Sequence, residues 1–220
     1  MSDPRPRPAE RGVAIPADTV TLPGDLVVPE RASGLVLFAH GSGSSRRSPR
    51  NRAVAQVLQA AGIGTLLFDL LTEREAEDRR NVFDILLLAE RLLAATDWAR
   101  AAPELERLPL GYFGASTGAA AALAAEARGS GPIAAVVSRG GRPDLAAEWL
   151  GRVRAPTLLI VGELDEPVLS LNRRAYDRLT CPKDLVVVPG ATHLFEEPGT
   201  LEQVAELATA WFRRYFGATP

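Results

Sequence analysis

This sequence has few of the residues that build disulfides, nucleic-acid surfaces or membrane spans. Its 220 residues include a single cysteine, Cys181, which cannot form an internal disulfide and fits a reducing compartment, with the cytoplasm as the default location. The formal net charge is −2 at pH 7, so the chain has no basic excess to neutralise phosphates, and nucleic acid is not an expected partner. No apolar run approaches the ~20 residues that cross a bilayer, and we therefore expect no membrane partner.

The composition is that of one globular domain. Hydrophobic residues make up 46% of the chain and charged residues 24%, enough to fill a core and to cover it with a soluble surface. Residues 1–12 are rich in proline and arginine and contain no apolar core, so they predict a disordered tail that is neither a signal peptide nor a membrane anchor. Residues 13–220 contain no linker-like stretch and are expected to form a single domain.

Short apolar runs alternate with segments of helical periodicity along most of the chain. Residues 13–28 are expected to form an antiparallel hairpin at a sheet edge, where their prolines are tolerated. The apolar runs that follow predict buried strands at residues 35–39, 64–69, 108–113, 133–138, 157–161 and 184–188. Helical patterns lie between or after them, at residues 51–61, 81–100, 119–127, 144–150, 168–179 and 200–216.

This alternation favours an α/β fold with a mostly parallel sheet and helices on both faces. Functional groups are then expected at the carboxyl ends of the strands. Asn81 is expected to cap the helix that ends near Arg100, and residues 72–80 are expected to form a solvated loop. The last helix carries four aromatic residues that suit either the core or a dimer surface, so a monomer and a homodimer both stay open.

The strongest motif is the Gly-x-Ser-x-Gly pentapeptide at residues 114–118. It follows a predicted strand and precedes an alanine-rich helix, the context in which such a motif lifts a serine hydroxyl off the sheet on a sharp turn. Glycines permit the unusual backbone angles that this turn requires. Ser116 is therefore the candidate nucleophile.

An acid and a histidine follow this serine, each just past a predicted strand. A Gly-x-x-Asp-x-x-Val motif contains Asp165, and the neighbouring Glu163 and Glu166 do not fit that spacing. The next strand end is followed by His193. A serine hydroxyl needs a neutral imidazole to take its proton, and a carboxylate must hold that imidazole in one tautomer. We therefore predict that Ser116, Asp165 and His193 form a catalytic triad.

A His-Gly-Ser-Gly loop follows the first buried strand and supplies the remaining part of such a site. The oxyanion of a tetrahedral intermediate needs backbone N–H donors, one after the nucleophile and one from a neighbouring loop. We predict the N–H groups of Thr117 and Ser42 as these donors, with Gly43 as the alternative to Ser42. His40 is expected to hold this loop rather than to act as the base.

Several residues beside these positions are candidates for contact with a substrate. Arg139 follows a strand end and has the chemistry to pair with a carboxylate, while Leu194 and Phe195 follow the candidate base. Gly43 is also expected to lie near the substrate. Three arginines after the oxyanion loop either bind a substrate carboxylate or form a solvated surface; these are Arg46, Arg47 and Arg50.

The order of these motifs resembles the α/β-hydrolase superfamily, and the compact chain is similar to its dienelactone hydrolase-like branch. The resemblance covers nearly the whole chain from about residue 13 and rests on Gly-x-Ser-x-Gly, Gly-x-x-Asp-x-x-Val, Gly-x-x-His and a strand that ends in His-Gly. It implies a mostly parallel sheet of about eight strands, a triad formed by Ser116, Asp165 and His193, and no cofactor or metal. The stretch between Ser138 and Thr157 is too short for a large cap, so an open site is expected.

One departure changes the expected substrate. Dienelactone hydrolases carry cysteine in the elbow, whereas this chain has Ser116 there and its cysteine at position 181. We therefore predict a serine esterase that cleaves small carboxylic esters or lactones, with a small-molecule ester as its partner. Two alternatives stay open: a ligand-binding protein on the same scaffold, and an acyl or peracid transferase that uses the same triad.

Overall fold

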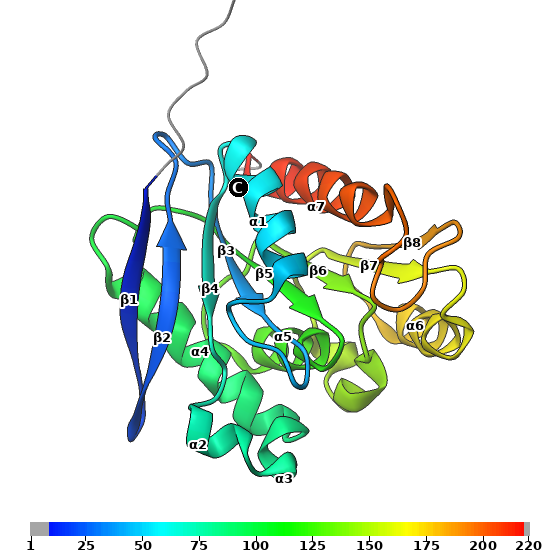
Figure 1. Ribbon diagram of the computed structural model, residues 1–220, viewed down its shortest axis with the longest axis horizontal. Coiled ribbons are helices and arrows are strands. Elements are labelled where there is room, and N and C mark those ends of the chain that lie inside the picture. Colours follow the sequence, from blue (N-terminus) through cyan, green and yellow to red (C-terminus); the bar gives the residue numbers. More distant parts are fainter. Residues whose placement is uncertain (1–8, 218–220) are drawn as a thin grey trace, which may run out of the picture.

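The fold is built on one eight-stranded sheet. The computed structural model describes residues 9–217 and orders the strands β1-β2-β4-β3-β5-β6-β7-β8 across the sheet (Figure 1). β1 pairs antiparallel with β2, and β2 with β4, whereas all other pairs are parallel. The strands span Glu10–Ala17 (β1), Val20–Val27 (β2), Leu35–Ala39 (β3), Gly64–Phe68 (β4), Leu110–Ala115 (β5), Ala135–Arg139 (β6), Thr157–Gly162 (β7) and Lys183–Val188 (β8).

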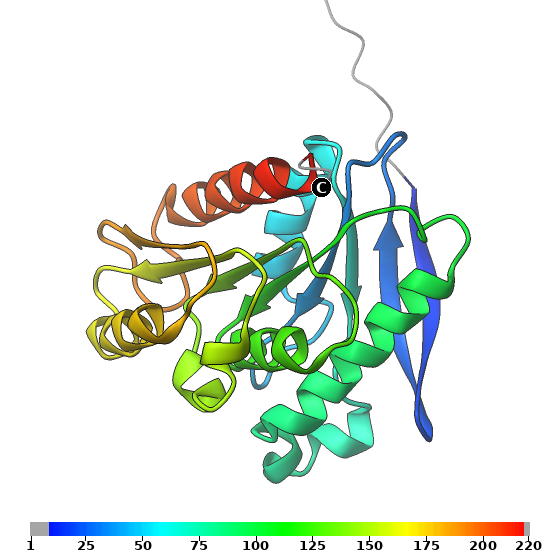
Figure 2. The same cartoon turned by 180° about the vertical axis from the view of Figure 1, so that it is seen from behind.

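Helices cover both faces of this sheet, as the predicted α/β fold requires. α1 and α7 pack on one face and α4, α5 and α6 on the other; Figure 2 shows the second face from the front. The helices span Pro49–Ala60 (α1), Glu73–Ala76 (α2), Arg79–Val82 (α3), Ile85–Ala101 (α4), Thr117–Arg128 (α5), Glu166–Arg178 (α6) and Thr200–Phe216 (α7). Two 3₁₀ turns, Pro143–Ala146 (η1) and Leu150–Arg152 (η2), lie between β6 and β7.

The central strands are mostly apolar because they are buried on both faces. In β3, Leu37 belongs to the core under α4 and α5, and Phe38 belongs to the core under α1 and α7. Three aromatic residues of α7, Trp211, Phe212 and Phe216, pack into this second core. Two-sided burial thus explains why these segments are continuous apolar runs rather than alternating ones.

The amino-terminal boundary differs from the sequence-based one. β1 begins at Glu10, so the prediction of a disordered tail is wrong for residues 10–12. The reason is tertiary, because Glu10 pairs with Val27 in the register of β2 and its carboxylate accepts a hydrogen bond from Arg52 at 2.8 Å. Residues 1–8 of the predicted tail lie outside the described residues, and residue 9 precedes β1 as coil.

The segment between β4 and α4 also differs from its prediction. Two short helices, α2 and α3, replace the solvated loop, and Thr72 and Glu75 form a reciprocal capping box at the start of α2. The cap of α4 is Asp84, whose carboxylate accepts a hydrogen bond from the N–H of Leu87 at 3.0 Å. The predicted cap, Asn81, instead donates its side-chain amide to the carbonyl of Glu75.

The carboxyl edge of the sheet is open. Within residues 9–217 no large cap covers it, since η1 and η2 alone fill the connection for which a helix at 144–150 was expected. In the same range, no helix has both the length and the apolar character needed to cross a membrane.

α1 starts at Pro49, two residues earlier than predicted. Ser48 caps the helix there, because its side chain accepts a hydrogen bond from the N–H of Asn51.

Candidate active site

Ser116 sits on a strained turn between β5 and α5. Its backbone has φ +51° and ψ −119°, a conformation that residues other than glycine rarely adopt. The flanking glycines are required by contact: a β-carbon on Gly114 would lie 2.4 Å from Cα of Ala119, and one on Gly118 would lie 2.1 Å from the carbonyl oxygen of Ala39. The pentapeptide therefore packs a helix directly against two strands and projects Ser116 at the carboxyl edge of the sheet.

Asp165 and His193 meet at the same edge, although they lie 28 positions apart in the sequence. His193 Nδ1 lies 2.6 Å from Oδ2 of Asp165, whose side chain is only 12% exposed. With Asp165 ionised, the imidazole donates from Nδ1, so Nε2 is the nitrogen that can accept a proton. The loop that carries His193 is tied to the acid's own loop, because the N–H of Leu164 donates to the carbonyl of Ala191 at 2.9 Å.

Residues 139 and 140 connect the serine turn to this pair. The N–H of Ser116 donates to the carbonyl of Arg139 at 3.2 Å. A β-carbon on Gly140 would lie 3.5 Å from Nδ1 and Cε1 of His193 and 3.2 Å from its carbonyl oxygen. Between Ser116 and His193 themselves, no hydrogen bond within 3.5 Å is present in the described part of the chain. Of the predicted triad, the structure thus joins Asp165 to His193 by a hydrogen bond, whereas Ser116 is not bonded to His193.

The His-Gly-Ser-Gly loop lies against the serine turn. A β-carbon on Gly41 would be 3.1 Å from Cβ of Ser116. The N–H groups of Ser42, Gly43 and Thr117 donate to no protein acceptor within residues 9–217. Their role as oxyanion donors stays a prediction.

His40 holds this loop in place. Its Nδ1 is 3.0 Å from the carbonyl of Gly41, and its Nε2 accepts a hydrogen bond from the N–H of Leu70 at 3.1 Å. These partners require a neutral ring with the proton on Nδ1. Burial lowers the pKa of His40 below its usual value, although the bond to Gly41 and the nearby Asp69 act in the opposite direction. Both ring nitrogens of His40 are thus engaged in hydrogen bonds to backbone groups.

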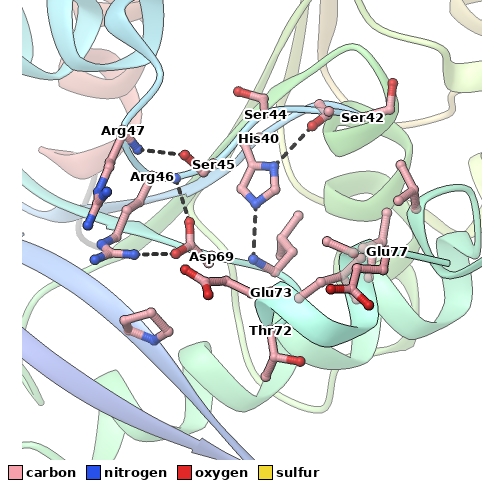
Figure 3. A pocket seen from close by; sticks show the side chains of 18 of the residues that line it. His40, Ser42, Ser44, Ser45, Arg46, Arg47, Asp69, Thr72, Glu73 and Glu77 are labelled. Atoms are coloured by element: carbon pink, nitrogen blue, oxygen red, sulfur yellow. Dashed lines mark hydrogen bonds and ion pairs between the residues drawn. The ribbon is translucent and has the colours of Figure 1, made fainter. Parts of the chain in front are cut away.

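A cavity of about 850 Å³ opens beside this loop, and Figure 3 shows His40 among its lining residues. Thr117 and the loop residues Gly41 and Ser42 line part of it, and α2 with its flanking residues forms another wall. Its apolar lining consists of Pro23, Leu70, Leu71, Ala76, Val82 and Leu88. Ser116 and His193 do not line the cavity among the described residues, so it extends from the oxyanion side of the site.

The sequence alone did not point to the α2 wall of this cavity. Arg91, which is 8% exposed, donates to Glu75 at 2.7 Å and to the carbonyl of Ala17, so it ties α2 to α4 and β1. The Thr-x-x-Glu pattern from Thr72 to Glu75 is the local signal that would have revealed this helix. The position of the wall depends on Arg91 and therefore on tertiary structure.

The loop arginines are held by acids. Arg46 pairs with Asp69 and, at 3.6 Å, with Asp25. Arg50 donates to Glu196 at 3.0 Å, and Arg47, labelled in Figure 3, lines the cavity. Two of the three candidate carboxylate binders are thus engaged in ion pairs.

The remaining candidates for substrate contact differ in how far they are buried. Leu194 is 38% exposed beside His193, as expected of a residue at an open site. Phe195 is 2% exposed and packs in the core under α1 and α7, so it does not face solvent as a pocket residue would. Arg139 is 7% exposed, and burial lowers its pKa to about 10, with the charge of Arg50 acting in the same direction.

Comparison with known proteins gives both close and distant relatives, and no protein-family profile matches the sequence. A solved structure of dienelactone hydrolase from Anabaena variabilis is 56% identical, has a TM-score of 0.93, and is matched over 95% of this chain and 99% of that one. Est1E from Butyrivibrio proteoclasticus has a TM-score of 0.81 at 17% identity, over 94% of this chain and 99% of that one, a likeness of fold alone.

A curated relative from Mycobacterium tuberculosis is named "Putative phosphoribosyl transferase". It is 60% identical over 211 residues, which make up 96% of this chain and 47% of the relative. The chain therefore spans about half the length of the curated relatives that it matches at this level.

Proposed function

Because the chain belongs to the dienelactone hydrolase family and has the α/β-hydrolase fold, we propose that it hydrolyses carboxylic esters, small acyl esters or lactones, through a covalent acyl-enzyme. The observation that carries this proposal is the 2.6 Å contact between His193 Nδ1 and Asp165 Oδ2, at the sheet edge where Ser116 projects from its strained turn. A solvent-exposed loop histidine has no need of a largely buried acid, whereas a general base does.

In the proposed reaction, Ser116 Oγ attacks the ester carbonyl while Nε2 of His193 takes its proton. Asp165 keeps the imidazole in the tautomer that can accept this proton and stabilises the imidazolium that forms. The negative charge that develops on the carbonyl oxygen is met by the N–H groups of Thr117 and of Ser42 or Gly43. These donors have no protein acceptor within residues 9–217, so they need not break a bond to bind the oxyanion.

The remaining steps of the cycle use the same groups. The imidazolium of His193 protonates the leaving alcohol, and the acyl group stays on Ser116. A water molecule, deprotonated by His193, then attacks the acyl-enzyme, which releases the acid and restores the serine hydroxyl. The open carboxyl edge admits water and small esters, and the cavity beside Thr117 offers apolar side chains to one part of the substrate.

The test is the rate of p-nitrophenyl acetate hydrolysis by the full chain and by Ser116→Ala. We expect kcat to fall by on the order of 10⁶-fold with an unchanged circular dichroism spectrum, as for nucleophile loss in a comparable triad. Ser170→Ala, a change at an exposed serine of α6, is the matched control and should leave kcat unaltered. Undiminished turnover by Ser116→Ala would refute the proposed nucleophile.

A double variant tests whether Ser116 and His193 act in the same step. If Ser116 and His193 act in one step, the double variant with both changed to alanine should lose no more kcat than Ser116→Ala alone. Separate, multiplicative losses would show that the two residues do not act together.

A further inference from the structure

Arg139 is a buried cation without an acid partner among the described residues. It ends β6, is 7% exposed, and within residues 9–217 its Nε and Nη1 atoms have no hydrogen-bond partner. Its remaining terminal nitrogen, Nη2, contacts Oδ1 of Asn51 at 3.4 Å, which is a long hydrogen bond. At neutral pH the side chain keeps its charge, because burial lowers its pKa only to about 10. Burial of an unpaired charge is costly, so the presence of arginine here calls for an explanation.

The guanidinium faces the ring of Phe195, two residues after His193. Cζ of Arg139 lies 6.0 Å from the ring centroid, within the range of a cation–π contact, and the water-poor surroundings strengthen such a contact. Phe195 has φ +56°, in the left-handed region where bulky residues are rarely found, and it is 2% exposed. Surrounding contacts must therefore impose this conformation, and Arg139 provides one of them.

Two further contacts connect the same residues to the site. Glu196, the next residue of the loop, pairs with Arg50 at 3.0 Å. On its backbone side, Arg139 accepts the N–H of Ser116, and the following Gly140 lies against the ring of His193. Arg139 thus contacts the turn of the nucleophile through its carbonyl and the loop of the base through its side chain.

We propose that Arg139 is a positioning residue, which fixes the loop of residues 193–196 relative to the serine turn by holding Phe195. The proposal rests on the proposed function, since it assigns a purpose to the loop geometry only if His193 is the base. A leucine or methionine at position 139 would fill the space without a charge penalty. The cation adds a directional contact to the aromatic ring that an apolar side chain lacks.

An alternative role for Arg139 is to bind a substrate anion, and the structure favours this role less. Arg139 does not line the cavity beside Thr117 among the described residues. The ring of Phe195 lies over the guanidinium and Arg139 is only 7% exposed, so little of the cation is open to an anion. Loss of an anion site would raise KM for anionic esters alone, whereas loss of loop positioning would lower kcat for every ester.

The experiment compares Arg139→Met, Arg139→Lys and the control Arg128→Met. Arg128 also lies over an aromatic ring, with 5.5 Å from its Cζ to the ring centroid of Trp149, but at the far end of α5. We expect Arg139→Met to lower kcat for neutral esters by about 10²-fold, the cost of a misplacement near 1 Å, with KM changed by less than about threefold. Arg139→Lys should recover at least about tenfold of that loss, because it keeps a cation near the ring. Arg128→Met should match the wild type in both constants.

A second measurement does not depend on activity. The N–H of Phe195 donates to the carbonyl of Thr192 at 3.2 Å, so its hydrogen exchange reports on loop order. Exchange at Phe195 should be at least about tenfold faster in Arg139→Met and unchanged in Arg128→Met. If Arg139→Met does not fold, Phe195→Leu removes the same contact from the other side and should give the same fall in kcat.

Each outcome decides a different point. A folded Arg139→Met with wild-type kcat and wild-type exchange would overturn the positioning role, as would a rise in KM confined to anionic esters. If the wild type cleaves no ester at all, the proposed function fails, and the exchange comparison still shows whether Arg139 orders the loop.

Discussion

Replacement of Gly118 by alanine would test the packing that creates the serine turn. Gly118 is the last residue of the Gly-x-Ser-x-Gly motif and lies in the first turn of α5. A β-carbon there would be 2.1 Å from the carbonyl oxygen of Ala39 and 2.5 Å from that of His40. Ordinary contact begins near 3.4 Å, so α5 or β3 would have to move by about 1 Å.

The expected loss of stability follows from the atoms that the β-carbon of Gly118→Ala would contact. Overpacking costs about 1–3 kcal/mol, and the upper end applies here because both obstructing atoms are backbone atoms that no rotamer change can move. A loss of about 3 kcal/mol in a chain of this length lowers the Tm by roughly 6–12 °C. A shift of the turn by about 1 Å should also lower kcat by about 10²-fold, since Ser116 and Thr117 move with it.

The assay combines thermal unfolding followed by circular dichroism with ester hydrolysis at a temperature where both proteins are folded. Gly12→Ala is the matched control, because a β-carbon on Gly12 would meet no atom within 4 Å and its φ is one that alanine adopts readily. That control should change the free energy of unfolding by no more than about 0.5 kcal/mol. A Gly118→Ala protein with the Tm and kcat of the wild type would refute the packing argument.

Three further predictions concern the acid, a buried hydrogen bond and a buried histidine. Asp165→Asn should lower kcat by about 10⁴-fold, because the amide favours the wrong tautomer of the base, while Glu166→Gln should not; equal activity of the two variants in steady-state kinetics would speak against the acid. Tyr112→Phe should lower the free energy of unfolding by about 1 kcal/mol in urea titrations, since it removes a 2.7 Å hydrogen bond to Thr96 in the core; no loss would mean that the bond contributes nothing net. Burial lowers the pKa of His40, so below pH ~6.5 the unfolded chain takes up a proton that the folded protein refuses, and stability must fall as the pH decreases. The fall in Tm between about pH 7.5 and about pH 5 should therefore be smaller in His40→Gln, and an identical slope would contradict this assignment.

The strands and the serine turn were predictable because their signals are local. Continuous apolar runs such as that of β3 follow from burial on both faces, and the glycines of the 114–118 motif are dictated by atoms that the neighbouring backbone places within 3 Å. The capping box between Thr72 and Glu75 is equally local, and the loop predicted there was wrong because this pattern starts a helix within a charged segment. The helix cap at Asp84 was missed because Asn81 is an equally good cap by residue type.

Other features depend on partners that are distant in the sequence. Residues 10–12 have the composition of a tail, and only their pairing with β2 makes them a strand. For Arg139, the sequence places a cation at a strand end but does not show that Phe195 covers it. The same holds for the cavity wall, whose position depends on the contact between Arg91 and Glu75. Tertiary contacts of this kind decide whether a polar residue is open to a substrate or packs behind the site.

The central claim is that Ser116 is a nucleophile activated by His193, and its most direct test is the mass of the intact protein after treatment with a fluorophosphonate. We predict one adduct on the wild type, located at Ser116 by peptide mapping, and none on Ser116→Ala. His193→Gln should react far more slowly, because it lacks the base that activates the hydroxyl. A wild-type protein that gains no adduct, or gains it at another residue, would contradict the claim.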